Sequence, residues 1–197
     1  MLKSRIRAAL RALAGRDTSP APPVVEYATH FVLLAGAVHL SRDMGPVLEL
    51  GMGYYSTPLL HRLCGNDRHL VSADTNADWY GRFAGFASPS HELHLVKSWP
   101  SWQVIESRHW AVAFVDCQPG EGRAEVVRRL RPQARFVVVH DTETDYDTGA
   151  DYKLEPVFAE FRYRNDYRFL RPYTTVVSDE APFALSEVET VWTPPRR

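Results

Sequence analysis

Short apolar runs alternate with polar, helix-like segments through the middle of the chain. The apolar runs are typical of buried strands and lie at residues 47–50, 69–73, 93–96, 111–115 and 135–139. The segments between them predict helices or loops near residues 58–63, 77–86, 101–108 and 122–131. Repeated strand–helix units predict a Rossmann-like α/β fold, with a mostly parallel sheet, helices on both faces and ligands at the carboxyl ends of the strands.

The last part of the chain has a different pattern. A helix is expected near residues 154–162, followed by short strands at Tyr167–Leu170, Thr174–Val177 and Val188–Trp192. These strands are too close together in sequence for crossover helices, so we expect the sheet to finish with an antiparallel strand pair.

The first part predicts helices outside the alternating region. A Ser-, Pro- and Ala-rich linker at residues 17–23 separates a first helix from a second one near residues 24–41. We therefore expect residues 1–41 to form N-terminal helices, acting as a lid or as packing elements, and residues 42–197 to form the ligand-binding domain.

Residues 1–16 carry five basic side chains and no acidic one, and their apolar residues recur at helical spacing. A basic amphipathic helix can be a membrane-surface or targeting element. A packing helix with a solvated basic face is favoured, because neither a cleavage-site pattern nor a long apolar core follows. Such a helix could also pair two subunits into a homodimer.

Composition narrows the class of partner. The chain has 197 residues, 45% hydrophobic and 24% charged, with a formal net charge of −1. This charge provides no field toward nucleic acid or anionic lipid, so a small-molecule or peptidic partner is expected. No apolar run reaches the roughly 18 residues of a membrane span. Cys64 and Cys117 are far apart in apolar stretches, which favours reduced thiols and a cytoplasmic location.

The stretch at residues 46–57, Pro-Val-Leu-Glu-Leu-Gly-Met-Gly-Tyr-Tyr-Ser-Thr, predicts a strand, a glycine-rich turn and the start of a helix. Gly51 and Gly53 permit positive φ and close approach of a ligand to the main chain. Thr57 followed by Pro58 is typical of an N-cap with proline in the first helical turn. Together these features predict a cofactor-binding turn.

Acidic residues stand at the ends of three predicted strands: Glu49, Asp74 and Asp116. Asp74 follows Gly51 by 23 residues, the interval at which a carboxylate can bind both hydroxyls of a ribose. A nicotinamide dinucleotide would satisfy that ribose site equally well. However, Ser56 stands where the dinucleotide fingerprint needs its third glycine, and the chain has no room for a second substrate domain.

From about Val47 to Val177 the chain resembles the class I S-adenosylmethionine-dependent methyltransferases, and among them small bacterial enzymes related to natural-product O-methyltransferases. The resemblance rests on Glu49-Leu50-Gly51-Met52-Gly53, Ser56-Thr57-Pro58-Leu59-Leu60-His61, Asp74, Val115-Asp116, His140-Asp141-Thr142 and the antiparallel finish. It implies that the cofactor is S-adenosylmethionine.

The resemblance also implies roles for individual residues. Those expected to contact the cofactor are Glu49, Gly51, Gly53, Tyr54, Tyr55, Ser56, Asp74, Ser98, Trp99 and Asp116. The glycines and tyrosines would hold the methionine part, Ser56 its carboxylate, and Glu49 the turn itself or the ammonium group. Asp74 would bind the ribose, Ser98 or Trp99 would flank the adenine, and Asp116 would lie nearest the transferred methyl group.

Asp116, His140 and Asp141 are the candidate catalytic residues. Methyl transfer from a sulfonium needs alignment of the acceptor and removal of its proton, and His140 could take that proton directly. In the catechol type of O-methyltransferase, a strand-four carboxylate and an Asp-Asn pair hold Mg²⁺. Here Asp116 and Asp141 match these ligands, but Thr142 replaces the asparagine, so Mg²⁺ is compatible with the residues and not implied by them.

The predicted function is S-adenosylmethionine-dependent methyl transfer to a hydroxyl, less favourably an amine, of a small molecule, in keeping with a role in secondary metabolism. The acidic segment at residues 142–153 would roof the acceptor site. Two alternatives stay open: methylation of a peptide or protein, and a non-catalytic subunit that binds S-adenosylmethionine to support a partner.

Overall fold

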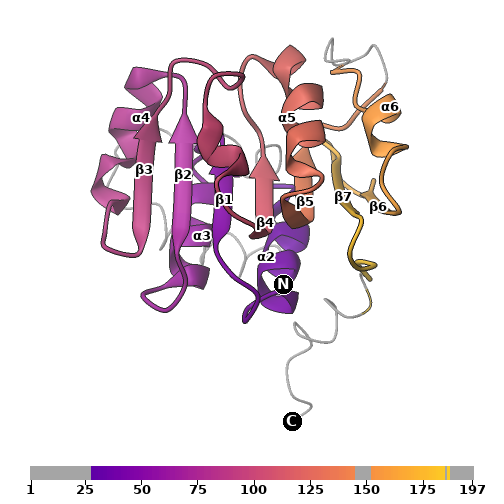
Figure 1. Ribbon diagram of the computed structural model, residues 1–197, viewed down its shortest axis with the longest axis horizontal. Helices are drawn as coiled ribbons and strands as arrows, with labels where there is room; N and C mark the ends of the chain where they lie inside the picture. Colours follow the sequence, from indigo (N-terminus) through magenta and orange to yellow (C-terminus); the bar gives the residue numbers. More distant parts are fainter. Residues whose placement is uncertain (1–27, 145–151, 185, 187–197) are drawn as a thin grey trace.

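The computed structural model describes residues 28–144, 152–184 and 186, and the described chain forms one seven-stranded sheet with helices on both faces (Figure 1). The strand order is β3-β2-β1-β4-β5-β7-β6. The strands are β1 (Val47–Leu50), β2 (Leu70–Asp74), β3 (His91–Leu95), β4 (Trp110–Val115), β5 (Ala134–His140), β6 (Tyr163–Tyr167) and β7 (Thr174–Ser178).

The helices follow the alternating pattern that the sequence predicts. The α-helices are α2 (Phe31–Leu40), α3 (Ser56–Cys64), α4 (Ala77–Phe83), α5 (Arg123–Leu130) and α6 (Glu155–Phe158). Three short 3₁₀ turns complete the set: η1 (Ala84–Phe86), η2 (Gln103–Glu106) and η3 (Gly120–Gly122).

Strands β1 to β5 pair in parallel, and β7 pairs antiparallel with both β5 and β6. This confirms the predicted parallel sheet with an antiparallel finish. In a parallel sheet the carboxyl ends of all strands lie along one edge, where open α/β folds bind their ligands.

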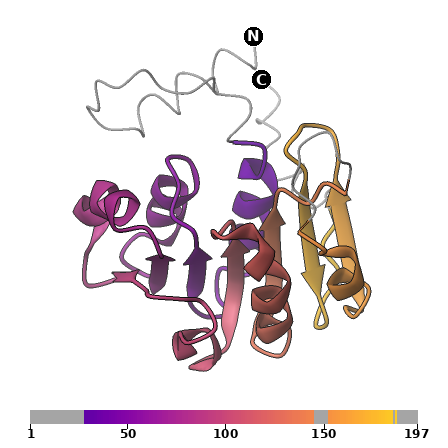
Figure 2. The ribbon, with the colours of Figure 1, turned by 90° about the horizontal axis from the view of Figure 1, so that it is seen from above.

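Each buried strand presents apolar side chains to both faces of the sheet, because helices cover both. Leu48 and Leu50 of β1 pack in a core with α5 and α6, whereas Val47 packs in a second core with α2 and α3. Figure 2 shows α2 and α3 on one side of the row of strands and α5 and α6 on the other. Glu49 is the one polar residue of β1, and it is fully buried.

Two local predictions differ from the structure. The strand expected at Tyr167–Leu170 is instead β6, at Tyr163–Tyr167. The sequence of β6 is Tyr-Arg-Asn-Asp-Tyr, and it lies at the edge of the sheet, where polar and charged side chains are tolerated; hydrophobicity therefore did not reveal it. The helix predicted over residues 154–162 is reduced to α6. The segment at residues 101–108, predicted to be a helix or a loop, contains η2.

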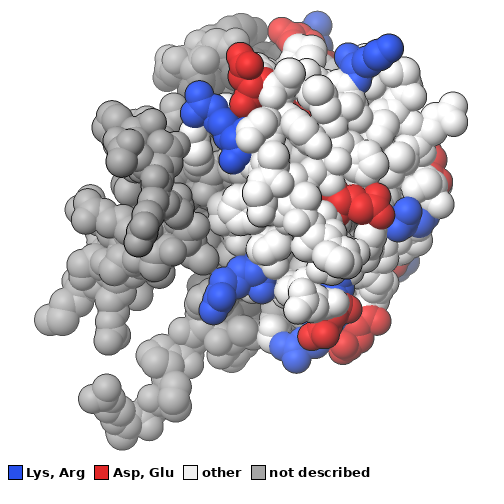
Figure 3. All heavy atoms as spheres, turned by 90° about the vertical axis from the view of Figure 1, so that its left-hand side faces the viewer, with Lys and Arg blue, Asp and Glu red and all other residues white. Residues whose placement is uncertain are grey.

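The N-terminal predictions are covered only in part. Residues 1–27 and the strand expected at Val188–Trp192 lie outside the described residues. Helix α2 packs its buried leucines and alanines against the sheet. Within the described chain, no helix has the length and apolar character that crossing a membrane requires. On the face shown in Figure 3, basic and acidic side chains are scattered and neither sign forms a large patch.

Candidate functional site

A cavity of about 510 Å³ opens at the carboxyl ends of the parallel strands. Its walls come from the turn after β1, from α4, and from the ends of β2, β4 and β5 and the residues that follow them. His30 and Pro172 complete the walls. The lining residues are His30, Met52, Gly53, Tyr54, Tyr55, Ser56, Asp74, Asn76, Trp79, Asp116, Gln118, His140, Asp141 and Pro172. The strand order thus brings most of the predicted site residues into one cavity.

Gly51 fixes the path of the turn after β1. Its φ is +93°, and a Cβ atom at this position would lie 2.4 Å from the backbone oxygen of Asp116 and 2.8 Å from the backbone nitrogen of Cys117. Only glycine allows the turn to pass this close to the end of β4. Gly51 therefore shapes the turn from below, and Gly53 is the glycine that lines the cavity.

Glu49 and Thr57 tie the strand to the helix beneath the turn. The Thr57 hydroxyl donates to both carboxylate oxygens of Glu49, at 2.9 and 3.0 Å, and accepts the backbone N–H of Gly53 at 3.0 Å. The predicted N-cap at Thr57 is thus wrong, since α3 begins at Ser56 with Tyr55 as its N-cap, and Thr57 instead holds the turn. Of the two roles expected for Glu49, its complete burial supports anchoring the turn.

Burial also changes the charge of Glu49. It raises the pKa of the Glu49 carboxyl to about 7, and the hydrogen bonds from neighbouring hydroxyls offset this only in part. At and below neutral pH a large fraction of this side chain is therefore a neutral acid.

Asp74 lies at the end of β2 with one side toward the cavity. Its Oδ2 accepts the Met52 N–H at 3.0 Å, and its Oδ1 accepts the Asn76 N–H at 2.8 Å. A carboxylate has about four acceptor positions, and the backbone does not fill them all. The Asp74 side chain is thus held by the protein and keeps acceptor capacity for a ligand hydroxyl.

Aromatic side chains form the wall beside Asp74. The Trp79 indole N–H donates to the Met52 carbonyl, and the Tyr54 ring meets the Trp79 ring edge-on at 5.1 Å. Trp79 lines the cavity, whereas Tyr80, the next residue of α4, does not. The wall provides a flat apolar surface next to a carboxylate, an arrangement that suits a nucleoside.

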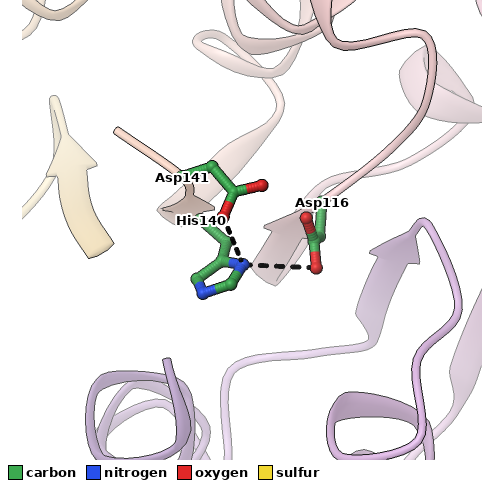
Figure 4. Close-up of side chains that lie close together, drawn as sticks. All are labelled: Asp116, His140 and Asp141. Carbon is green, nitrogen blue, oxygen red and sulfur yellow. Dashed lines mark ion pairs between the residues drawn. The ribbon is translucent and has the colours of Figure 1, made fainter. Parts of the chain in front are cut away.

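Asp116, His140 and Asp141 lie together at the ends of β4 and β5 (Figure 4). His140 Nδ1 is 3.4 Å from Asp116 Oδ2 and 3.2 Å from Asp141 Oδ1. Asp141 has a φ of 54°, a left-handed conformation that aspartate tolerates better than most residues. The sequence correctly places these three residues together because each follows a neighbouring parallel strand.

Arg123, a residue that the sequence analysis missed, completes this cluster. Its guanidinium donates to Asp116 Oδ1 at 2.9 Å and to Asp141 Oδ2 at 3.1 Å. It also donates to the Cys117 and His140 carbonyl oxygens, each at 2.8 Å, and the Tyr152 ring stacks on it at 4.6 Å. The side chain is fully buried. The only sequence signal is a basic residue in an otherwise apolar position of the helix after β4.

These contacts set the protonation of His140. The Thr29 hydroxyl donates to the Pro172 carbonyl at 2.6 Å, so at 2.9 Å from His140 Nε2 it acts as an acceptor. Burial lowers the pKa of His140, but Asp116 and Asp141 outweigh burial and the net pKa is raised. Burial likewise opposes ionisation of Asp116, yet His140 and Arg123 hold the pKa of Asp116 near 2.

The raised pKa favours the imidazolium form of His140, with Nε2 bonded to Thr29 and Nδ1 facing the two carboxylates, and this form cannot take a proton from a substrate. The expected role of His140 as the general base does not fit these surroundings. Two cations and two carboxylates instead form a charge-balanced quartet of Asp116, Arg123, His140 and Asp141.

The quartet also bears on the expected Mg²⁺ site. The ligand atoms of Asp116, His140 and Asp141 lie within 4.8 Å of one another, close enough in principle to surround an ion. However, each of the four carboxylate oxygens already faces Arg123 or His140, and two neighbouring cations oppose a third. A divalent ion would have to displace a fully buried arginine, so the residues do not fit a metal.

Two predicted cofactor residues lie elsewhere. Trp99 is buried in the core, with its indole N–H donating to the Gln118 carbonyl at 2.7 Å, and Ser98 is exposed and bonded to Ser101. Neither lines the cavity, because the chain after β3 turns toward the face covered by α5. Cys117 is buried beneath the site, and burial raises the pKa of its thiol to about 12, which makes it an unreactive packing residue.

Comparison of whole structures places this architecture among known folds. A cofactor-bound protein from MTB, Rv0187, matches with a TM-score of 0.60 and 18% identity over 90% of this chain and 91% of its own. An O-methyltransferase from Bacillus cereus in complex with SAH, S-adenosylhomocysteine, matches with a TM-score of 0.58 and 14% identity, covering 89% and 88% of the two chains. This chain has the class I methyltransferase fold.

A third solved structure of this class I methyltransferase fold is the O-methyltransferase TomG from Streptomyces achromogenes in complex with SAM, S-adenosylmethionine. It matches with a TM-score of 0.55 and 17% identity, covering 89% of this chain and 88% of its own. Methyltransferases of other kinds share the fold as well. No protein-family model and no curated protein matches the chain.

Proposed function

We propose that this protein binds S-adenosylmethionine in the cavity at the strand ends and transfers its methyl group to a small molecule. The observation that carries the proposal is Asp74, a buried carboxylate fixed by two backbone N–H groups, with free acceptor positions beside a glycine turn and an aromatic wall. This combination is what a nucleoside with two ribose hydroxyls requires.

The remaining wall suits the other end of the cofactor. Gly53, Tyr54 and Tyr55 form the turn, and Ser56 is the first residue of α3. The unpaired N–H groups and the dipole at a helix N-terminus favour an anion, so the amino-acid carboxylate belongs there. The transferable methyl group would then point toward Asp116.

The acceptor is proposed to be a hydroxyl compound. The cofactor supplies an electrophilic methyl carbon on a sulfonium, which leaves as a thioether. The charges of Asp116 and Asp141 are balanced by Arg123 and His140, so this part of the cavity offers little attraction for an ammonium group. A hydroxyl acceptor is therefore favoured over an amine.

Two further points support an enzyme of this kind. The solved structures with the same fold include O-methyltransferases, one of them described as involved in tomaymycin synthesis, which is in keeping with secondary metabolism. Both cysteines are free and buried, which is compatible with a reducing compartment such as the cytoplasm.

The proposal is tested by measuring S-adenosylhomocysteine affinity by isothermal titration calorimetry. Asp74→Asn keeps the shape of the side chain but removes its charge. Each hydrogen bond to a charged group contributes about 1.5–3 kcal/mol of net stabilisation. We expect affinity to fall about tenfold or more. Asp78→Asn, an exposed aspartate in the first turn of α4, is the matched control and should bind as the wild type does. Equal affinity in all three proteins, or binding of a nicotinamide dinucleotide in place of S-adenosylhomocysteine, would reject the proposal.

A further inference from the structure

His30 is a buried histidine in the cavity wall that differs from His140 in its hydrogen bonding. It directly precedes α2, is 2% exposed and lines the same cavity as Asp116 and His140. Among the described residues, neither of its ring nitrogens has a hydrogen-bond partner. A buried polar group without a partner is costly, and native structures seldom retain one without a function. The vacant ring nitrogens therefore point to a ligand.

The ring of His30 is held in place by its neighbours. It packs against the Phe114 ring at 4.8 Å and meets the His140 ring edge-on, also at 4.8 Å. Burial and, to a smaller extent, the neighbouring His140 lower the pKa of His30 to about 3, and Asp116 opposes this only in part. His30 is thus a neutral imidazole, with one nitrogen able to accept a hydrogen bond and one able to donate.

His30 also lies on the acceptor side of the cavity. The cofactor side is formed by Asp74, Trp79 and the turn after β1, whereas His30 contacts His140 at the ends of β4 and β5. In the charged quartet, Asp116 and Asp141 are already paired with Arg123 and His140. Within the described cavity wall, His30 is the histidine that can receive a proton.

We propose that His30 contacts the hydroxyl group of the methyl acceptor and takes its proton. This inference rests on the proposed function and identifies the acceptor as an uncharged hydroxyl compound. The acceptor oxygen forms its new bond to the methyl carbon, the carbon–sulfur bond breaks with its electron pair going to sulfur, and the hydroxyl proton moves to the free ring nitrogen of His30. As it is methylated, the oxygen becomes a far stronger acid than an imidazolium, so even a weakly basic histidine can receive the proton.

Phenol and anisole are the probes that test this contact. They share an aromatic ring, but only phenol has a hydroxyl proton to donate. The protein is saturated with S-adenosylhomocysteine, its histidines are labelled with ¹⁵N, and the ring nitrogens of His30 are followed by NMR as each probe is added. We expect phenol to shift these resonances in a saturable way and anisole to leave them unchanged.

Two variants complete the test. His30→Phe keeps an aromatic ring against Phe114 but removes both nitrogens, and loss of one hydrogen bond should weaken phenol binding about tenfold without weakening anisole binding. His39→Phe alters the other histidine of the α2 region, which does not line the cavity, and should bind phenol as the wild type does. If His30→Phe does not fold, the wild-type resonances still decide.

The outcomes separate this inference from the proposed function. If the wild type does not bind S-adenosylhomocysteine, the proposed function is contradicted. Normal S-adenosylhomocysteine binding with no response of His30 to phenol, or with equal phenol affinity in His30→Phe and the wild type, would overturn the role of His30 alone.

Discussion

Arg123 carries a positive charge into the interior, where two carboxylates and two carbonyl oxygens surround its guanidinium. Removing one member of a buried ionic group leaves its partners uncompensated, at a cost of about 3–5 kcal/mol. Asp116 and Asp141 are acceptable in the cavity only because Arg123 and His140 neutralise them. In a chain with the same aspartates and no buried arginine, the uncompensated negative charge would favour a bound metal ion.

This reasoning predicts how the protein responds to Mn²⁺, a spectroscopic substitute for Mg²⁺. The wild type should bind no stoichiometric Mn²⁺ at millimolar concentration by electron paramagnetic resonance. Arg123→Met frees one oxygen of each aspartate, and this variant should gain Mn²⁺ affinity while losing stability. Arg128→Met, an exposed position of the same helix, is the control and should behave as the wild type. Tight Mn²⁺ binding by the wild type that Asp141→Asn abolishes would show that Asp116 and Asp141 bind a metal ion despite Arg123.

Single residues also show how far the sequence could be interpreted. Asp74, Asp116, His140 and Asp141 could be placed in one cavity because each ends a predicted parallel strand, and parallel strand ends share an edge. Arg123 could not, because it reaches the site through the packing of α5 on the sheet. The proton-accepting role expected for His140 does not fit its surroundings, because Thr29, far away in sequence, bonds Nε2 and two carboxylates face Nδ1.

At the scale of elements, the unit formed by β1, its turn and α3 is organised around Glu49. The Thr57 hydroxyl joins the carboxyl group of β1 to the backbone of the turn. Because the pKa of Glu49 is about 7 in the folded protein and near 4.5 when unfolded, the folded state favours the protonated form. Its contribution to stability is full below about pH 4.5 and is lost as pH rises toward 7.

Glu49→Gln keeps a neutral hydrogen-bonding side chain and should remove this pH dependence. The free energy of unfolding of the wild type, measured relative to Glu49→Gln by denaturant titration, should fall by about 3 kcal/mol between pH 4.5 and pH 8. Glu121→Gln alters an exposed glutamate and serves as the control. A difference between wild type and Glu49→Gln that stays constant over this range would show that folding does not shift the pKa of Glu49.

The elements that could be predicted from sequence are those whose burial imposes an apolar pattern. Strands β1, β2, β4 and β5 are covered on both faces, and their apolar runs gave their positions within about one residue of the observed bounds. Strand β6 is polar because it forms the sheet edge, and its charged residues do not resemble a strand by hydrophobicity. Edge position is a property of the assembled sheet, so no local pattern could reveal it.

For the molecule as a whole, the topology determines where chemistry can take place. The order β3-β2-β1-β4-β5 puts the turn after β1 between Asp74 on one side and Asp116 on the other. One cavity can thereby accommodate a nucleoside at β2 and an acceptor at β5, with the reacting atoms near β4. The formal net charge of −1 adds no long-range attraction for nucleic acid.

The most direct test is a crystal structure of the protein with S-adenosylhomocysteine. The account predicts that the ribose hydroxyls hydrogen-bond to the Asp74 carboxylate, with the sulfur atom on the side of Asp116. Density for the nucleoside in another place, such as the open groove beside Gln103 and Arg129, would contradict it. So would a cavity that stays empty at millimolar S-adenosylhomocysteine.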